Sequence, residues 1–82
     1  MAKQTISMKK LRCAIESARS FSPETCTDIG INSHVWVIVG TCGLSLHKMV
    51  RRREMRKTVN YWREKTTDDI IHELQDQEWE AA

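Results

Sequence analysis

Apolar residues recur at helical spacing near the start of the 82-residue chain. The stripe in residues 5–20 consists of Met8, Leu11, Ile15 and Ala18. This spacing of three and four predicts an amphipathic helix, and Thr5 or Ser7 can cap it with a side-chain oxygen.

A second stripe at helical spacing lies near the end of the chain and consists of Ile70, Ile71 and Leu74. Thr66 and Asp69 precede it at the spacing of a capping box, in which two side chains satisfy free amides of the first turn. A last helix is therefore expected over residues 67–80.

The segment between these helices begins with a strong helix-start signal, Ser22-Pro23-Glu24. It combines a capping hydroxyl, a proline at the first helical position and an acid near the positive end of the helix dipole. Gly30 is a natural stop, because glycine takes the left-handed conformation at little cost. A short helix over residues 23–29 is predicted.

Residues 35–39 (Val-Trp-Val-Ile-Val) are ambiguous between helix and strand. Their β-branched and aromatic side chains favour a strand by propensity. They do not alternate between apolar and polar, so a strand here would be buried on both faces, which is difficult in so small a chain. We therefore expect a short buried helix over 34–41 and keep a strand at 35–39 as the alternative.

The charge pattern changes sharply along the second half of the chain. Residues 48–65 contain eight basic and two acidic side chains, whereas residues 66–82 contain six acidic and no Lys or Arg. A basic block followed by an acidic one indicates a polyanionic partner, or an acidic segment that covers the basic one.

Residues 35–54 fit the template of a helix-turn-helix unit when Gly43 is placed at the turn. The template needs a glycine that accepts positive φ and a second helix anchored from inside. Gly43-Leu44-Ser45 supplies the turn and a capping serine, and the anchoring face consists of Leu46, Met49 and Val50. This segment resembles the turn of many small bacterial and phage helix-turn-helix regulators. A second register, with Gly30 at the turn, would make residues 33–41 the recognition helix. That segment is too apolar to face DNA, so we keep the register with Gly43.

The resemblance implies a transcriptional regulator that binds double-stranded DNA and recognises its sequence with a basic helix at about 45–57 in the major groove. Long cationic donors on the outer face would contact bases, and those that follow would neutralise phosphates. The DNA-binding residues expected are Ser45, His47, Lys48, Arg51, Arg52, Arg53, Arg56 and Lys57.

A straight helix through this block would bury opposite faces at its two ends. The later stripe of Met55, Val59 and Trp62 lies about 180° from the anchoring stripe at 100° per residue. Either the helix bends near residues 52–54, or its second half packs against another subunit. We favour the second and expect a homodimer surface made of Val59, Trp62, Ile70 and Leu74.

Together these patterns predict one all-α domain over residues 1–82, a compact bundle of four to five short helices with frayed ends at 1–4 and 80–82. The alternative is an α+β fold with a strand at 35–39. The alternative function is a protein-interaction module, such as an inhibitor, an antirepressor or an antitoxin-like adaptor. It would use the basic block and the acidic residues 68–80.

The remaining patterns argue against other classes of protein. Three widely spaced cysteines and no secretory signal favour a reducing, cytoplasmic location. A zinc site from Cys26, His34, Cys42 and His47 lacks the usual ligand spacing, so neither a metal nor a cofactor is expected. Only twelve uncharged residues follow one another from Val35, too few to span a membrane. No nucleophile, metal or phosphate-binding motif of an enzyme is present.

Overall fold

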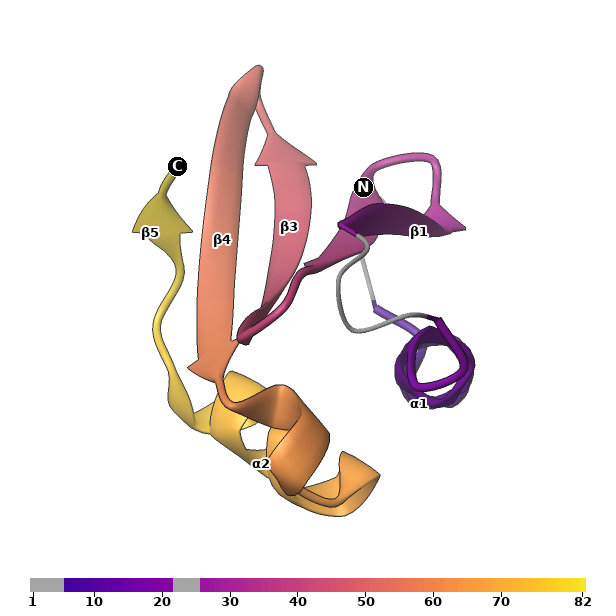
Figure 1. Cartoon of the computed structure of the whole chain (residues 1–82). Helices are drawn as coiled ribbons and strands as arrows, with labels where there is room; N and C mark the ends of the chain where they lie inside the picture. Colours follow the sequence, from indigo (N-terminus) through magenta and orange to yellow (C-terminus); the bar gives the residue numbers. More distant parts are fainter. Residues whose placement is uncertain (1–5, 22–25) are drawn as a thin grey trace.

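The computed structural model describes residues 6–21 and 26–82, which form an α+β fold with a five-stranded antiparallel sheet and two α-helices (Figure 1). The strands lie side by side in sequence order, so the sheet is a simple meander. The elements in chain order are α1 (Met8–Ala18), β1 (Thr27–Asn32), β2 (Val35–Val39), β3 (Gly43–Val50), β4 (Arg53–Asn60), the 3₁₀ helix η1 (Trp62–Glu64), α2 (Thr67–Asp76) and β5 (Glu80–Ala81).

The predicted all-α bundle is therefore wrong. Residues expected as helices at 34–41 and 45–57 form strands β2, β3 and β4. The alternative α+β fold, with a strand at 35–39, is the one that the structure has. Burial in β2 alternates from residue to residue, although both of its faces carry apolar side chains. The missing alternation in the sequence therefore did not exclude a strand.

The predicted short helix at 23–29 is also wrong where it can be judged. Residues 27–29 begin strand β1, and 23–25 lie outside the described residues. Gly30 lies within β1 and ends no helix. Gly43 begins β3, and no described glycine has a positive φ. Neither register of the helix-turn-helix unit exists in this fold.

The two terminal helices are confirmed, but both are shorter than predicted: α1 covers Met8–Ala18, and α2 ends at Asp76, so that residues 80–81 form β5 instead. α1 begins after Ser7, whose Oγ accepts a hydrogen bond from the Lys10 amide at 3.3 Å. α2 begins after Thr66, whose Oγ1 accepts one from the Asp69 amide at 3.1 Å. These caps satisfy amides that the first turn of a helix leaves free.

Both helices contribute their apolar stripes to a single core on one face of the sheet, which we call the helix side. From the helices, the core residues are Leu11, Ala14, Ile15, Ala18, Ile70, Ile71 and Leu74. From the sheet and η1 they are Ile31, Val35, Val37, Val39, Leu44, Leu46, Val59 and Trp62. Burial of this apolar surface is the main stabilising contribution to the fold.

The β3–β4 hairpin extends beyond this core. In Figure 1 its tip projects away from both helices, which lie near the other end of the hairpin. The described chain is accordingly elongated, with principal extents of 38 × 21 × 20 Å. Over residues 6–21 and 26–82, none of the helices has the length and apolar character needed to cross a membrane.

Candidate nucleic-acid interface

The projecting tip of the β3–β4 hairpin is a two-residue turn made of two arginines. Val50 pairs with Arg53, and the turn residues Arg51 and Arg52 have φ values of 50° and 69°. Positive φ at both central positions defines a type I′ turn, which matches the twist of a hairpin but normally uses Asn-Gly. For an L-residue with a Cβ, the left-handed conformation costs roughly 1–2 kcal/mol.

The strand register distributes the other predicted contact residues over the two faces of the hairpin. Lys48 lies opposite Met55, and Lys57 lies opposite Leu46. These residues therefore share the helix side with the core. Ser45, His47 and Arg56 lie on the other face, which we call the open face because no described helix covers it.

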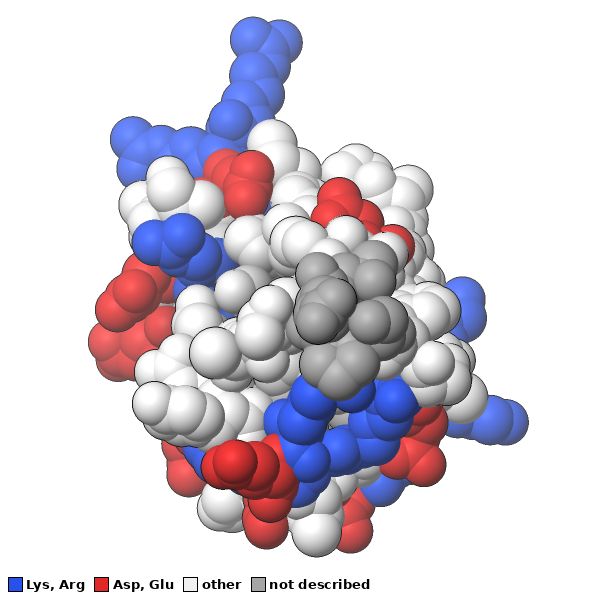
Figure 2. Space-filling view, viewed as in Figure 1, with Lys and Arg blue, Asp and Glu red and all other residues white. Residues whose placement is uncertain are grey.

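The arginines of the hairpin lie apart from the ion pairs of the described residues. The ion pairs among the described residues use other cations, as in Arg12–Asp68 at 2.6 Å and Lys65–Glu73 at 2.6 Å. Within that same part of the chain, Arg51, Arg52, Arg53 and Arg56 form none. In Figure 2 basic side chains project at the end of the molecule where the hairpin tip lies. The acidic segment after residue 66 covers the basic block only in part, since Glu73 pairs with Lys65 and β5 lies beside Met55 and Arg56, while the turn residues Arg51 and Arg52 have no strand beside them among the described residues.

His47 lies where it cannot contact a nucleic acid. Only 5% of its surface is exposed, its ring stacks on Trp36 with centroids 5.4 Å apart, and its Nδ1 lies 2.8 Å from Glu54 Oε2. Its Nε2 is buried without a hydrogen-bond partner among the described residues. Trp36, expected in the core, is instead half-buried on the open face and packs against this histidine.

The ammonium of Lys57 also contacts other parts of the fold. Its ammonium donates a hydrogen bond of 2.7 Å to the carbonyl of Leu74, in the last turn of α2, where helix carbonyls lack partners. Burial, and then the nearby charge of Lys48, lower the pKa of Lys57 below its ordinary value. Of the eight predicted contact residues, Lys48, Arg51, Arg52, Arg53 and Arg56 therefore remain as candidates. Ser45 is half-buried beside Thr58.

The four residues predicted to form a dimer surface belong to the core of a single chain. Val59, Trp62, Ile70 and Leu74 are each at most 2% exposed. Trp62 also donates a hydrogen bond from Nε1 to the Gly40 carbonyl at 3.2 Å. Their stripe appeared as a second helical face because β4, η1 and α2 all point apolar side chains at the same core.

Sequence reasoning missed Trp79, which stands beside the hairpin on the helix side. The ammonium groups of Lys48 and Lys57 lie 4.2 and 4.8 Å from its ring centroid. The Trp79 ring borders a cavity of about 430 Å³ near the hairpin tip. A lone aromatic after an acidic helix gave no pattern from which this position could be inferred.

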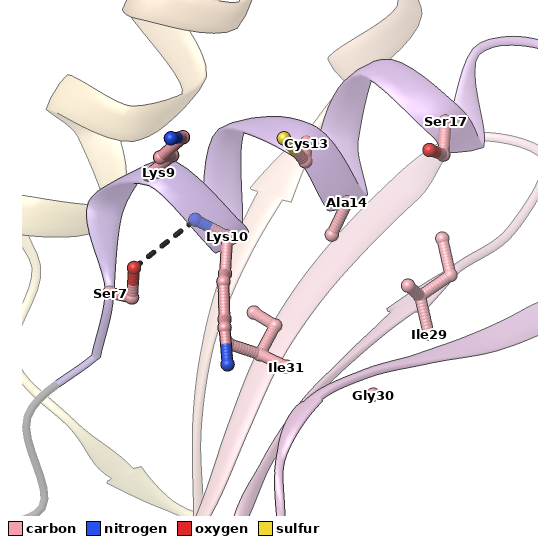
Figure 3. A pocket seen from close by; sticks show the side chains of 9 residues that line it. All are labelled: Ser7, Lys9, Lys10, Cys13, Ala14, Ser17, Ile29, Gly30 and Ile31. Atoms are coloured by element: carbon pink, nitrogen blue, oxygen red, sulfur yellow. Dashed lines mark hydrogen bonds between the residues drawn. The ribbon is translucent and has the colours of Figure 1, made fainter.

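A second cavity, of about 610 Å³, lies between α1 and β1 (Figure 3). The helix contributes Lys10, Cys13 and Ser17 to one wall, and Ile29 and Ile31 belong to the strand opposite. In the described part of the chain, no strand pairs with the outer edge of β1.

The described residues contain no group of three His, Cys, Asp or Glu side chains that could hold a metal ion. Cys13, Cys26 and Cys42 are exposed free thiols. No family model matches this chain, and comparisons with curated proteins and with solved structures returned no match.

Proposed function

We propose that this protein binds duplex DNA by inserting the distal half of the β3–β4 hairpin, residues 48–56, into the major groove. The observation that supports this most strongly is the set of arginines at and beside the tip, which project from the fold without an intramolecular ion pair in the described chain. The major groove is about 12 Å wide and admits a two-stranded β-ribbon as well as a helix. The basic residues expected from the sequence to contact DNA thus lie on a β-hairpin and not on a helix.

The turn supports the same proposal. Arg51 and Arg52 adopt a backbone conformation that asparagine and glycine adopt with less strain. Strained residues in folded proteins often lie at functional sites, where another requirement outweighs local stability. Two exposed guanidinium groups at the projecting tip of the hairpin satisfy such a requirement if they contact a polyanion.

The positions suggest a division of roles. Arg51 and Arg52 would reach furthest into the groove, where a guanidinium makes bidentate hydrogen bonds to guanine. Arg53, Arg56 and Lys48 lie along the ribbon, where they would neutralise phosphates. Sequence-specific regulation of transcription, as expected from the sequence, would depend on the tip. We place this activity in the cytoplasm, in keeping with three exposed free thiols.

The test is a salt titration of duplex binding by fluorescence anisotropy. We expect wild-type affinity to fall steeply with salt, because each neutralised phosphate adds about one unit to the log–log slope. The double variant Arg53→Gln/Arg56→Gln, which removes two of the residues placed on phosphates, should lower the slope by about two units. Lys9→Gln/Lys10→Gln, which changes the net charge equally on exposed residues of α1, is the control and should bind as wild type does.

Failure of the wild-type protein to bind duplex DNA at low salt would refute the proposal. An equal loss of affinity in both double variants would also contradict it. In that case net charge alone, and not the hairpin, would account for binding.

A second candidate function is binding of an extended peptide, and the groove between α1 and β1 favours it. Peptides bind to many domains by adding a strand to an open sheet edge beside a helix. The test is selection from a random peptide library on wild-type protein and on Cys13→Trp, which fills the groove. Enrichment should be lost in that variant and kept in Cys42→Trp, since Cys42 does not line the groove.

A further inference from the structure

The cavity beside the hairpin tip combines cations with an aromatic wall. It lies on the helix side of the sheet, and the residues that line it are Lys48, Val50, Arg51, Arg53, Met55 and Trp79. Three of the six are cationic and none is acidic. Its volume of about 430 Å³ falls at the small end of the range of ligand sites, which is roughly 300–1,000 Å³.

Trp79 is held in place by the C-terminal tail. The side-chain amide of Gln77 accepts a hydrogen bond from the Thr58 amide at 3.1 Å and donates one to the Thr58 carbonyl at 2.7 Å. Beyond Trp79, β5 pairs with Met55 and Arg56 of β4. Both sides of Trp79 are therefore tied to the edge of β4, yet its indole stays half-exposed at the cavity.

The chemistry of this cavity matches a nucleotide. An indole offers a flat surface on which any base can stack, and neighbouring cations attract the phosphate. The ammonium groups of Lys48 and Lys57 lie over the Trp79 ring, 4.2 and 4.8 Å from its centroid. Lys57 is held by its hydrogen bond to the Leu74 carbonyl, which leaves Lys48 as the cation that can move. Its flexible side chain can turn to a phosphate when a base takes its place. Val50 and Met55 add apolar surface without a competing charge.

We propose that this cavity binds one unpaired nucleotide, so that the preferred ligand is a DNA duplex with a single-stranded overhang. This inference rests on the proposed function, because the arginines that would hold the duplex also border the cavity. A base in a continuous duplex is stacked between its neighbours and cannot reach Trp79. A base in an overhang is free to stack on the indole.

The experiment compares a blunt duplex with the same duplex carrying a three-nucleotide overhang, by anisotropy at one salt concentration. Wild type should prefer the overhang by about tenfold, the usual effect of one stacked base. Trp79→Ala should abolish the preference, measured as the ratio of the two affinities within that variant. Trp79→Phe, which keeps a flat ring, should retain most of it. Trp36→Ala removes an aromatic from the open face and should keep the full preference.

The outcomes separate this inference from the proposal on which it rests. Equal affinity of wild type for the two duplexes overturns the inference and leaves duplex binding intact. A preference that persists in Trp79→Ala also overturns it. Absence of binding to either duplex overturns the proposed function itself.

Discussion

The two halves of the β3–β4 hairpin differ in almost every physical property. The half nearest the helices places Leu44, Leu46 and Val59 in the core, and none of them is more than 3% exposed. The half that projects carries Arg51 and Arg52 in a strained turn, and Val50 is exposed beside them. One continuous pair of strands thus serves as scaffold at one end and as a charged surface at the other. Stability and binding should therefore respond to substitutions in different halves.

The largest effect is expected in the buried half. Leu46→Ala removes a side chain that is 3% exposed and leaves a cavity between the sheet and the helices. Such substitutions reduce the free energy of unfolding by about 2–5 kcal/mol. Urea denaturation should show this loss, while Val50→Ala near the tip should change stability by less than about 1 kcal/mol. Similar losses of unfolding free energy in Leu46→Ala and Val50→Ala would contradict the assignment of stability to the buried half of the hairpin.

The second largest effect is an increase in the free energy of unfolding, caused by substitutions at the hairpin tip. Arg51→Asn/Arg52→Gly gives the turn its preferred residues, so the free energy of unfolding should rise by on the order of 2 kcal/mol. The same variant should bind duplex DNA more weakly than wild type. Thermal denaturation and anisotropy on one preparation measure both quantities. A loss of stability would show that the turn is not of type I′.

A substitution at the boundary between the two halves of the hairpin should reduce stability by a smaller amount. Glu54→Gln keeps the shape of the side chain beside buried His47 but weakens the 2.8 Å contact. We expect a loss of about 1 kcal/mol, typical of one hydrogen bond. Glu80→Gln, an exposed acid on the same face of neighbouring β5, is the matched control and should be neutral. Equal effects would mean that the His47 contact contributes nothing.

The smallest effect is a pH dependence from Lys57. Its pKa is lowered in the folded protein, so the unfolded chain binds more protons above the folded-state pKa. The free energy of unfolding should therefore rise with pH between the folded-state pKa and the unfolded value of about 10.4. Lys57→Met should lose this rise in denaturation at alkaline pH, while Lys10→Met, on exposed α1, should keep it. If the free energy of unfolding of Lys57→Met still rose with pH as in wild type, Lys57 would not be the group responsible.

The helices could be predicted from the sequence because their signals are local. Spacing of three and four and a capping oxygen act within a few residues, and both α1 and α2 were found on that basis. The hairpin could not be found in this way. Its turn is Arg-Arg, without the Asn or Gly that usually marks a two-residue turn. Leu46, Met49 and Val50 imitated a helical stripe, although Met49 lies on the face opposite the other two.

One signal in the sequence did point to the hairpin. A straight helix over residues 45–64 would have buried opposite faces at its two ends, and a fold back at residues 51–52 removes that conflict. The basic residues of the candidate site were identified from the density of Lys and Arg along residues 48–65 and from the helix-turn-helix resemblance. The template was wrong, but charge density does not depend on secondary structure. The partition of these residues between the two faces required the strand register. The contribution of Trp79 required the position of a tail distant in sequence.

The projecting half of the hairpin is the surface that we propose for binding DNA. Backbone amide chemical shifts, recorded while duplex DNA is added at low salt, test it most directly. We expect the largest chemical-shift changes on residues 48–56 and small changes in the amides of α1. Changes concentrated on α1, or none at the hairpin tip, would contradict it.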